Sequence, residues 1–447
     1  MASIVIGNAH ILDPSEALDF SGCLAVRDGL IAYAGEDARK AEEAAGAGAG
    51  RVDADGLLLV PGLVDMHVHL REPGDEAEET IATGARAAAA GGFASIAAMP
   101  NTDPPVDNES AIIFTRREAR RAGYANVFPV GTITAGRQGQ ELAEMAQMAR
   151  GGAVAYSDDG AAVPAAGLLR RALSYAKMLD KPLLEHCEDK SLLAGGVMDE
   201  GYMSTALGLA GIPDECEEII VARDVAMARL TGGRIHIQHV STAKSVELIR
   251  RAKAEGIRVT AEVTPHHLSL TSECLKDYDP VYKVSPPLRD SHDVEACRLG
   301  LKDGSIDAIA SDHAPHLEGE KELEFAFAPS GMTGLETTLG VVSTVLVRSG
   351  LFAWPEILPA LTSRPSDILG LGRGRLALGL PGDLTLIDPL RAWTVEPEKF
   401  YSRSRNCPFR GWKLEGRAVL TVVGGVVVFD LDARAGQLPS RSVTTIR

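Results

Sequence analysis

Four histidines and two aspartates are the residues of this chain best placed for chemistry, because each ends an apolar, strand-like run. His67 and His69 end the run 57–70. Residues i and i+2 of an extended strand point to the same side, so these two imidazoles could share a metal ion. On its own, the HxH pair fits two core or surface histidines equally well. Other runs end in further residues with metal-binding side chains, namely Asp159, His186, His239 and Asp312.

Zinc is the metal that this set of ligands favours. Imidazole nitrogens and carboxylate oxygens suit zinc, and six ligands are more than one tetrahedral ion needs. We therefore expect two zinc ions per chain, bridged by a carboxylate and a hydroxide. The six cysteines form no CxxC pair and suggest no disulfide framework, so we expect reduced thiols that take no part in the metal site.

Each candidate ligand also has a structural alternative. Asp158 and Asp159 lie in a DDG turn signal, so we expect one of the two to serve the turn. His186 and His239 could be hydrogen-bonded polar groups at strand ends. The remaining histidines are interpreted as structural, as facing away from the site, or as exposed: His10, His236, His266, His267, His292 and His313.

The middle of the chain must bring the six ligands together. Apolar runs of strand length alternate there with segments whose apolar residues repeat about every 3.6 positions, which predicts a parallel sheet covered by helices. Eight runs predict an α/β fold with a (β/α)8 TIM-like barrel over residues 57–374, whose strand ends meet on one face. A doubly wound open sheet is the alternative, but no glycine-rich nucleotide loop follows the first run. The runs lie at 57–70, 93–100, 126–134, 153–160, 181–189, 234–242, 258–268 and 307–316.

The two ends of the chain differ from the middle. They contain short strand-like segments with Asp-Gly, Gly-Gly and Gly-Arg turn signals. We expect residues 1–56 and 375–447 to form one small β-sandwich domain beside the barrel.

Composition excludes some functions. The chain has 447 residues and a formal net charge of -16, which argues against nonspecific binding of nucleic acid but leaves room for a small anionic substrate at a local cluster of cations. No run approaches the ~18 apolar residues of a membrane span, and the first residues lack the pattern of a signal peptide. We therefore expect a cytoplasmic protein that does not bind membranes.

A series of short motifs runs along the chain: PGLVDMHVHLREPG (61–74), MPNT (99–102), SDDG (157–160), EHCED (185–189), HIQHVST (236–242), PPLR (286–289) and SDHAPH (311–316). These motifs resemble, in the same order, those of the dihydroorotase family, in the Asp-bridged bacterial branch of the cyclic amidohydrolases. The likeness spans essentially the whole chain. It implies a zinc-dependent enzyme of the amidohydrolase superfamily that reversibly cyclises N-carbamoyl-L-aspartate to (S)-dihydroorotate plus water, in de novo pyrimidine (UMP) biosynthesis.

The resemblance gives each of the six ligands a role. His67 and His69 hold the more buried zinc ion, and His186 and His239 hold the other. Asp159 bridges both ions. Asp312 contacts the first ion and shuttles the proton from a zinc-bound hydroxide to the leaving nitrogen. The run 153–160 has no lysine to serve as the carboxylated bridge of many relatives, so the bridge must be a carboxylate.

The resemblance also implies a clamp for the substrate carboxylate and contacts to the ring. A guanidinium fork suits such a clamp. Where many dihydroorotases have Asn before PPLR, this chain has Ser285, as hydantoinase-like relatives do. A hydroxyl could still bond the substrate, but the difference leaves the ring substrate open. The predicted substrate-binding residues are His69, Arg71, Asn101, Ser285, His316, Ser330 and Gly331.

Several alternatives remain at this point. A hydantoinase or dihydropyrimidinase, or an allantoinase, would share the fold, although a neutral ring needs no carboxylate clamp. A non-catalytic scaffold of aspartate transcarbamoylase is a rival of another class, but such a chain should have lost ligands that this one keeps. We expect a homo-oligomer, with association with an aspartate transcarbamoylase as an open possibility, and a loop over 316–331 that closes on the site as a lid.

Overall fold

The computed structural model describes residues 3–434. The last part of the predicted C-terminal segment, 435–447, and residues 1–2 lie outside the described residues. None of the helices in the described part is both long and apolar enough to cross a membrane.

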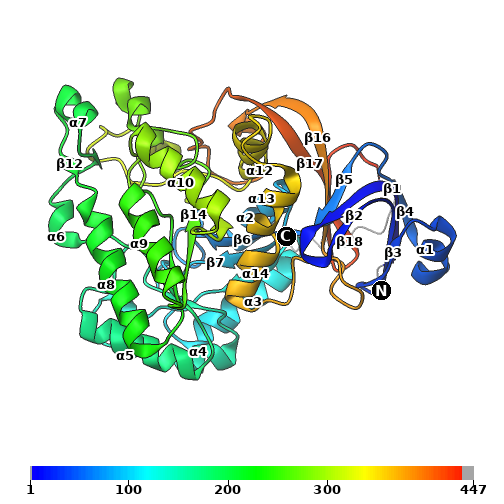
Figure 1. The fold of residues 1–447 in the computed structure, drawn as a ribbon, viewed down its shortest axis with the longest axis horizontal. Coiled ribbons are helices and arrows are strands. Elements are labelled where there is room, and N and C mark those ends of the chain that lie inside the picture. Colours follow the sequence, from blue (N-terminus) through cyan, green and yellow to red (C-terminus); the bar gives the residue numbers. More distant parts are fainter. Residues whose placement is uncertain (1–2, 435–447) are drawn as a thin grey trace.

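Eight short strands in the described part pair in parallel around the middle of the molecule (Figure 1). They form a three-stranded and a five-stranded sheet, and the isolated parallel bridges Gly131–Tyr156 and Val68–His313 connect the two sheets at both sides. The parallel pairing therefore runs in a ring. In order, the strands are β6 (Leu63–Val68), β7 (Phe93–Ala98), β8 (Asn126–Pro129), β9 (Tyr156–Ser157), β10 (Leu183–Glu185), β13 (Ile235–Ile237), β14 (Val259–Val263) and β15 (Ala308–Ile309).

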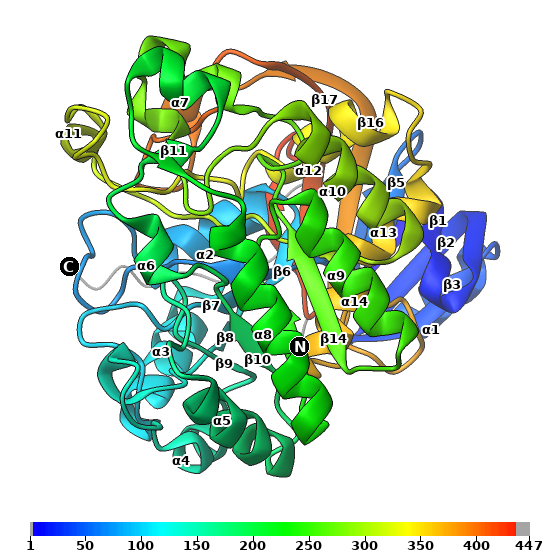
Figure 2. The ribbon, with the colours of Figure 1, turned by 60° about the vertical axis from the view of Figure 1, so that its left-hand side comes forward.

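Helices follow the strands and cover them from outside. Figure 2 shows α8, α9 and α10 side by side across one flank of the molecule. Side-chain oxygens cap several N-termini; for example, Thr242 accepts the Ser245 backbone N–H at the start of α9. The helices are α2 (Ile81–Ala90), α3 (Glu109–Ala122), α4 (Met145–Gly151), α5 (Ala166–Met178), α8 (Glu215–Thr231), α9 (Ala243–Ala254), α10 (Ser291–Asp303), α12 (Thr338–Val342), α13 (Trp354–Leu361) and α14 (Ser363–Leu369).

Strands from both ends of the chain share one further sheet, at the right of Figure 1. A core of aliphatic side chains, including Ile6, Leu24 and Leu420, is buried on it. Helix α1 (Ala38–Ala45) packs against β2 and β3. The strand order is β18 (Val426–Asp430), β17 (Lys413–Val423), β16 (Leu384–Thr394), β5 (Leu58–Pro61), β1 (Ile4–Asp13), β2 (Leu18–Arg27) and β3 (Leu30–Gly35), with β4 (Gly50–Asp53) paired to β1.

The boundary expected at residue 57 is wrong by several residues. The apolar run 57–70 is two strands: β5 belongs to the sheet of the chain ends, and β6 belongs to the ring. The chain crosses between them at Gly62, where a Cβ atom would lie 2.4 Å from the Ala94 Cβ. Only glycine fits this close approach. Both strands are fully buried, so their apolar sequence is continuous and hides the crossing.

The domain boundary expected at residue 375 also differs from the structure. Between β16 and β17 the chain leaves the end sheet and packs on the loops of the ring. Cys407 and Phe409 share a buried cluster with Val284 and Leu288. Residues 395–412 therefore belong to the environment of the ring, although strands of the other sheet flank them.

Short elements lie in the loops around the ring's carboxyl end: α6 (Lys190–Leu193), β11 (Met198–Asp199), α7 (Tyr202–Leu207), β12 (Gly211–Ile212) and α11 (Glu318–Lys321). All six cysteines are free, as the sequence predicted.

Candidate metal centre and substrate pocket

A cavity of about 330 Å³ opens where the parallel strands end. It gathers residues from seven different strand ends or following loops, which is where catalytic groups lie in barrels of this kind. Every predicted site residue lines it except His67, which is fully buried beneath. Val284, Gly160 and Ala314 complete the wall.

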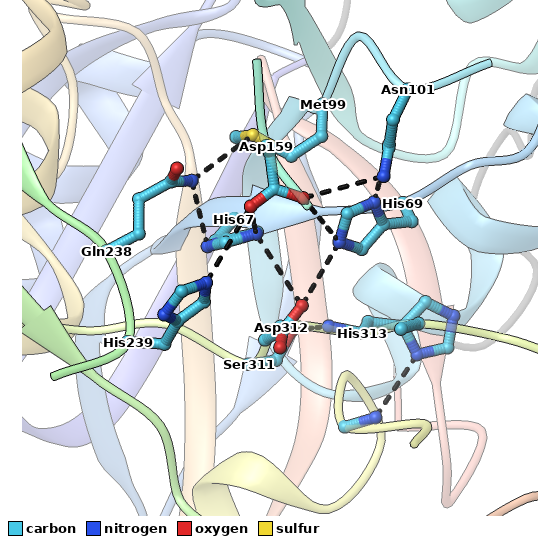
Figure 3. A network of polar contacts seen from close by, with 12 residues as sticks. His67, His69, Met99, Asn101, Asp159, Gln238, His239, Ser311, Asp312 and His313 are labelled. Atoms are coloured by element: carbon cyan, nitrogen blue, oxygen red, sulfur yellow. Dashed lines mark hydrogen bonds and ion pairs between the residues drawn. The ribbon is translucent and has the colours of Figure 1, made fainter. Parts of the chain in front are cut away.

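The first group of candidate ligands comes from β6 and from the end of β15. The Nε2 atom of His69 lies 3.1 Å from Oδ1 of Asp312, and Nε2 of His67 lies 3.5 Å from the same oxygen (Figure 3). His67 and His69 point to one side, as i and i+2 residues of a strand must. Asp312 has a positive φ of 45°, an uncommon conformation for an aspartate that directs its carboxylate at both rings.

Asp159 lies between this group and the second pair of histidines. Its Oδ1 is 3.3 Å from Nε2 of His67 and 3.7 Å from both Nε2 of His239 and Nδ1 of His186. Its Oδ2 is 3.5 Å from Nε2 of His69. A carboxylate that faces candidate ligands on two sides could bind a cation on each side.

Two buried atoms test whether these residues fit a metal. Nε2 of His67 and Oδ1 of Asp159 are both buried and have no hydrogen-bond partner within residues 3–434. Unsatisfied buried polar atoms are rare and costly, and a cation between them would satisfy both. The donor set of imidazole nitrogens and carboxylate oxygens also suits zinc. The residues therefore fit the expected metal.

The other end of the cavity holds the residues predicted to clamp a substrate carboxylate. Nε of Arg71 lies 2.9 Å from Oε2 of Glu78, and Nε2 of His316 lies 2.9 Å from the carbonyl oxygen of Ser330. Asn101 contacts the metal end through Nδ1 of His69, at 2.8 Å. The structure thus brings both predicted groups into one cavity, with Asn101 and His69 joining them.

Comparison with known proteins agrees with this arrangement. Residues 56–245 match the family model described as dihydro-orotase-like. The dihydroorotase of Pelotomaculum thermopropionicum is 52% identical over 95% of this chain and 98% of that protein. The dihydroorotase of Citrifermentans bemidjiense is 47% identical over 96% of this chain and 99% of its own length. The chain belongs to the dihydroorotase family.

Solved structures share the fold at lower identity. The L-hydantoinase (dihydropyrimidinase) of Arthrobacter aurescens has a TM-score of 0.86 and 25% identity, covering 96% of each chain. The dihydropyrimidinase of Brevibacillus agri has a TM-score of 0.83 and 23% identity, covering 96% of this chain and 95% of its own. The mixed α/β fold of the amidohydrolases is therefore confirmed. These two structures are 25% and 23% identical to the chain, whereas the two dihydroorotases are 52% and 47% identical to it.

The histidines of the site set the charge of its two aspartates. Burial raises the pKa of Asp312 and of Asp159, but the charge of His67, together with the hydrogen bonds and charges of the other histidines, outweighs burial and holds the pKa of each carboxyl well below its usual range. For His67 burial lowers the pKa, and the charges of Asp159, Glu262 and Asp312 outweigh this effect and raise it. The pocket of this dihydroorotase family member therefore keeps both aspartates ionised.

Glu262 is a functional residue that the sequence analysis missed. Its Oε1 lies 2.6 Å from Nδ1 of His67, and its Oε2 lies 3.1 Å from Nε2 of His236. It therefore directs Nε2 of His67 toward the two aspartates. The signal that could have identified Glu262 is a glutamate within the otherwise apolar run 258–268. His236 is structural, as expected, and Thr260 bonds its other nitrogen.

Ser285 and His186 are connected by Glu188, which was also missed. Nε2 of His186 lies 2.6 Å from Oε2 of Glu188, and the Ser285 hydroxyl donates to the same oxygen at 2.5 Å. Ser285 lines the cavity as predicted, but its hydroxyl proton is directed to Glu188. Asp158, the other half of the turn, accepts the backbone N–H groups of Ile133 and Thr134, so it has the structural role expected of one of the pair.

The other histidines occupy structural positions. His313 contacts Glu79 and accepts the Gly334 backbone N–H, and His267 contacts Thr264 and the Pro286 carbonyl. His266 is buried, and burial lowers its pKa to about 4. His10 and His292 are exposed.

The segment expected to act as a lid is held beside the cavity by hydrogen bonds. Nζ of Lys321 donates to the carbonyl oxygens of Pro280, Lys283 and Pro329. At its end, Gly331 has a φ of 135°, and a Cβ atom there would lie 2.8 Å from Nε2 of His316. The last residues of the segment must therefore keep a glycine beside the clamp.

Proposed function

We propose that this chain catalyses the reversible cyclisation of N-carbamoyl-L-aspartate to (S)-dihydroorotate and water, the dihydroorotase step of de novo pyrimidine (UMP) biosynthesis. One observation carries the proposal: a small cavity has five metal-type ligands at one end, with the sixth, His67, buried beneath it, and Arg71, Asn101 and His316 at the other end. A cyclic amide with a carboxylate on its ring matches both ends. The family membership supports the same reaction.

We infer that the site holds zinc, with two ions per chain. His67, His69 and Asp312 would hold one ion, His186 and His239 the other, and Asp159 both. Zinc, when bound, acts as a Lewis acid and makes water a stronger nucleophile at neutral pH. The two buried unpartnered atoms, on His67 and Asp159, support this inference.

Different residues of the chain then bind the substrate and transfer the proton. Arg71 and His316 bind the ring carboxylate and orient the amide toward Asp312. In hydrolysis, water adds to the amide carbon, the C–N bond breaks, and Asp312 carries a proton from the attacking water to the departing ring nitrogen. Cyclisation runs in reverse and requires Asp312 to start protonated.

The finer description of the fold belongs to the same proposal. We infer a (β/α)8 barrel as the catalytic domain, predicted over 57–374, and a β-sandwich from the two chain ends. The ring of parallel pairings and the shared end sheet support this division. Cytoplasmic location, homo-oligomer formation and association with aspartate transcarbamoylase remain predictions, as does the absence of nucleic-acid partners.

The test is a substrate panel with metal analysis. The purified protein is assayed on dihydroorotate, hydantoin, dihydrouracil and allantoin, with zinc per chain measured on the same sample. We expect kcat/KM for dihydroorotate to exceed the others by about 10²-fold or more, because only that ring engages the clamp. Preference for a neutral ring would favour the hydantoinase alternative, and zinc-loaded protein without any turnover would favour a scaffold.

A further inference from the structure

The pair Glu188 and Ser285 lies directly behind His186, the candidate ligand furthest from the first metal group. Glu188 is almost fully buried, with 4% of its surface exposed. Its Oε2 receives two hydrogen bonds, from Nε2 of His186 at 2.6 Å and from the Ser285 hydroxyl at 2.5 Å. Its Oε1 is buried and has no hydrogen-bond partner among the described residues. Both of its interactions therefore converge on one oxygen, which faces His186.

This contact decides which nitrogen of His186 is available. A neutral imidazole carries one N–H, and a carboxylate can only accept a hydrogen bond. Nε2 must therefore carry the proton, which leaves Nδ1 with its lone pair. Nδ1 is the nitrogen that faces Asp159 at 3.7 Å and His239 at 2.9 Å. Glu188 thus selects the tautomer that can bind a cation at this end of the site.

Ser285 is engaged in the same unit. A serine hydroxyl has a single proton to donate, and here it goes to Glu188. It is therefore not available to donate to a substrate oxygen. Ser285 also lines the cavity, so its hydroxyl group lies between the cavity and Glu188.

We propose that Glu188 and Ser285 are positioning residues for the second metal position: Glu188 fixes the tautomer and orientation of His186, and Ser285 acts through Glu188 rather than on the substrate. The proposal deepens the proposed function and depends on it for its kinetic part. The zinc-binding part stands on its own, because tautomer selection requires no turnover.

The test begins with zinc affinity of the full-length protein, measured by competition with a chelator for Glu188→Gln, Ser285→Ala and the double variant. Gln keeps the shape of Glu188 but removes its charge, and neutral hydrogen bonds are about half as strong as charge-assisted ones. We expect Glu188→Gln to weaken one of two zinc sites by about tenfold or more. Ser285→Ala should weaken the same site by a few-fold. The double variant should match Glu188→Gln, because Ser285 has no other route to the metal.

Asp189→Asn is the matched control. It removes one carboxylate charge at the adjacent position, yet its side chain caps the first turn of α6, a function that Asn also performs. Its zinc affinity should equal that of the unmodified protein. Long-range ¹H–¹⁵N spectra of the histidine rings in the zinc-loaded proteins provide a second readout: His186 should be the Nε2–H tautomer in the unmodified protein and a tautomer mixture in Glu188→Gln.

Two results would overturn the proposal. Zinc binding by Glu188→Gln that equals that of Asp189→Asn would remove the role of Glu188. A raised KM for dihydroorotate in Ser285→Ala, with unchanged zinc affinity, would make Ser285 a direct substrate ligand. If the unmodified protein binds zinc as described but turns over no dihydroorotate, the proposed function fails while the positioning role holds.

Discussion

The two ends of the active-site cavity are prepared in opposite ways. At the metal end, buried atoms of His67 and Asp159 have no hydrogen-bond partner, and imidazoles and carboxylates face one another at 3.1 to 3.7 Å. At the clamp end, the side chains already have protein partners: Arg71 contacts Glu78, and His316 contacts Glu78 and the Ser330 carbonyl.

This difference means that a cation and a substrate carboxylate would replace different protein contacts on binding. A cation entering the metal end would satisfy the two atoms, on His67 and Asp159, that lack a hydrogen-bond partner among the described residues. A substrate carboxylate must instead share Arg71 and His316 with Glu78 and a backbone carbonyl. The clamp therefore gains selectivity by exchanging hydrogen bonds, and its net contribution to affinity is smaller than the number of contacts suggests.

Asp312→Asn should produce the largest effect on activity. It tests the chemistry proposed at the metal end. The amide oxygen can still face the cation, but the side chain can no longer take up the proton from water. We expect kcat to fall by about 10³-fold with zinc content retained. Steady-state kinetics and zinc analysis on one sample check this. A kcat within tenfold of the unmodified protein would refute the shuttle role of Asp312.

Glu262→Gln tests whether the metal end depends on its buried support. The bond from Nδ1 of His67 to Glu262 is 2.6 Å long, and removing its charge weakens the orientation of His67. We expect zinc affinity to fall by about 10-fold to 100-fold. Glu247→Gln, which removes a partly exposed carboxylate on α9, serves as the control. Equal affinities of the two variants would contradict this role of Glu262.

Arg71→Lys tests the clamp end by itself. A lysine carries the charge but cannot present two parallel N–H groups to a carboxylate. We expect KM for dihydroorotate to rise by about tenfold while zinc content stays the same. Arg117→Lys, on the exposed face of α3, should leave KM unchanged. An unchanged KM in Arg71→Lys would mean that the clamp does not bind the substrate carboxylate.

Glu336→Gln concerns a support behind the clamp and should have the smallest effect. Glu336 accepts the backbone N–H groups of Tyr401 and Ser402, in the segment whose Asn406 contacts Gly331. Burial raises the pKa of Glu336 from an ordinary 4.5 to about 7. The folded chain therefore holds a proton that the unfolded chain releases, so the contribution to stability is full below pH ~4.5 and is lost as pH rises through ~7.

We expect the unmodified protein to lose about 1 kcal/mol of unfolding free energy between pH 5 and pH 8 through this group, since its partly exposed side chain is screened by solvent. Glu336→Gln should lack this loss, because an amide does not titrate. Denaturant unfolding of both proteins at the two pH values measures the difference. Parallel pH profiles for both proteins would exclude Glu336 as their source.

The sequence predicted the candidate metal ligands better than the carboxylates that contact the site residues from behind. His67 and His69 were found through strand periodicity and their place at the end of an apolar run, and the other ligands through similar places. Glu262, Glu188 and Glu78 were not found, because each has a partner, His67, Ser285 and His316 respectively, that is 195, 97 or 238 positions away in the chain but adjacent in space. For Ser285, the sequence placed the residue at the cavity, but not the direction of its hydroxyl.

The domain boundaries show the same limit. Apolarity identifies a buried strand, but it does not say which sheet buries it, so β5 and β6 read as one element until Gly62 separates them.

The sequence by itself determined the kinds of ligand, their places at strand ends and the alternation of strands with helices, because these depend on side-chain chemistry and local periodicity. The tertiary structure alone decided which strands pair around the ring, which nitrogen of each histidine faces the cavity and which carboxylates stand behind them. Those choices depend on contacts between distant segments, and a local pattern carries no information about its distant partners.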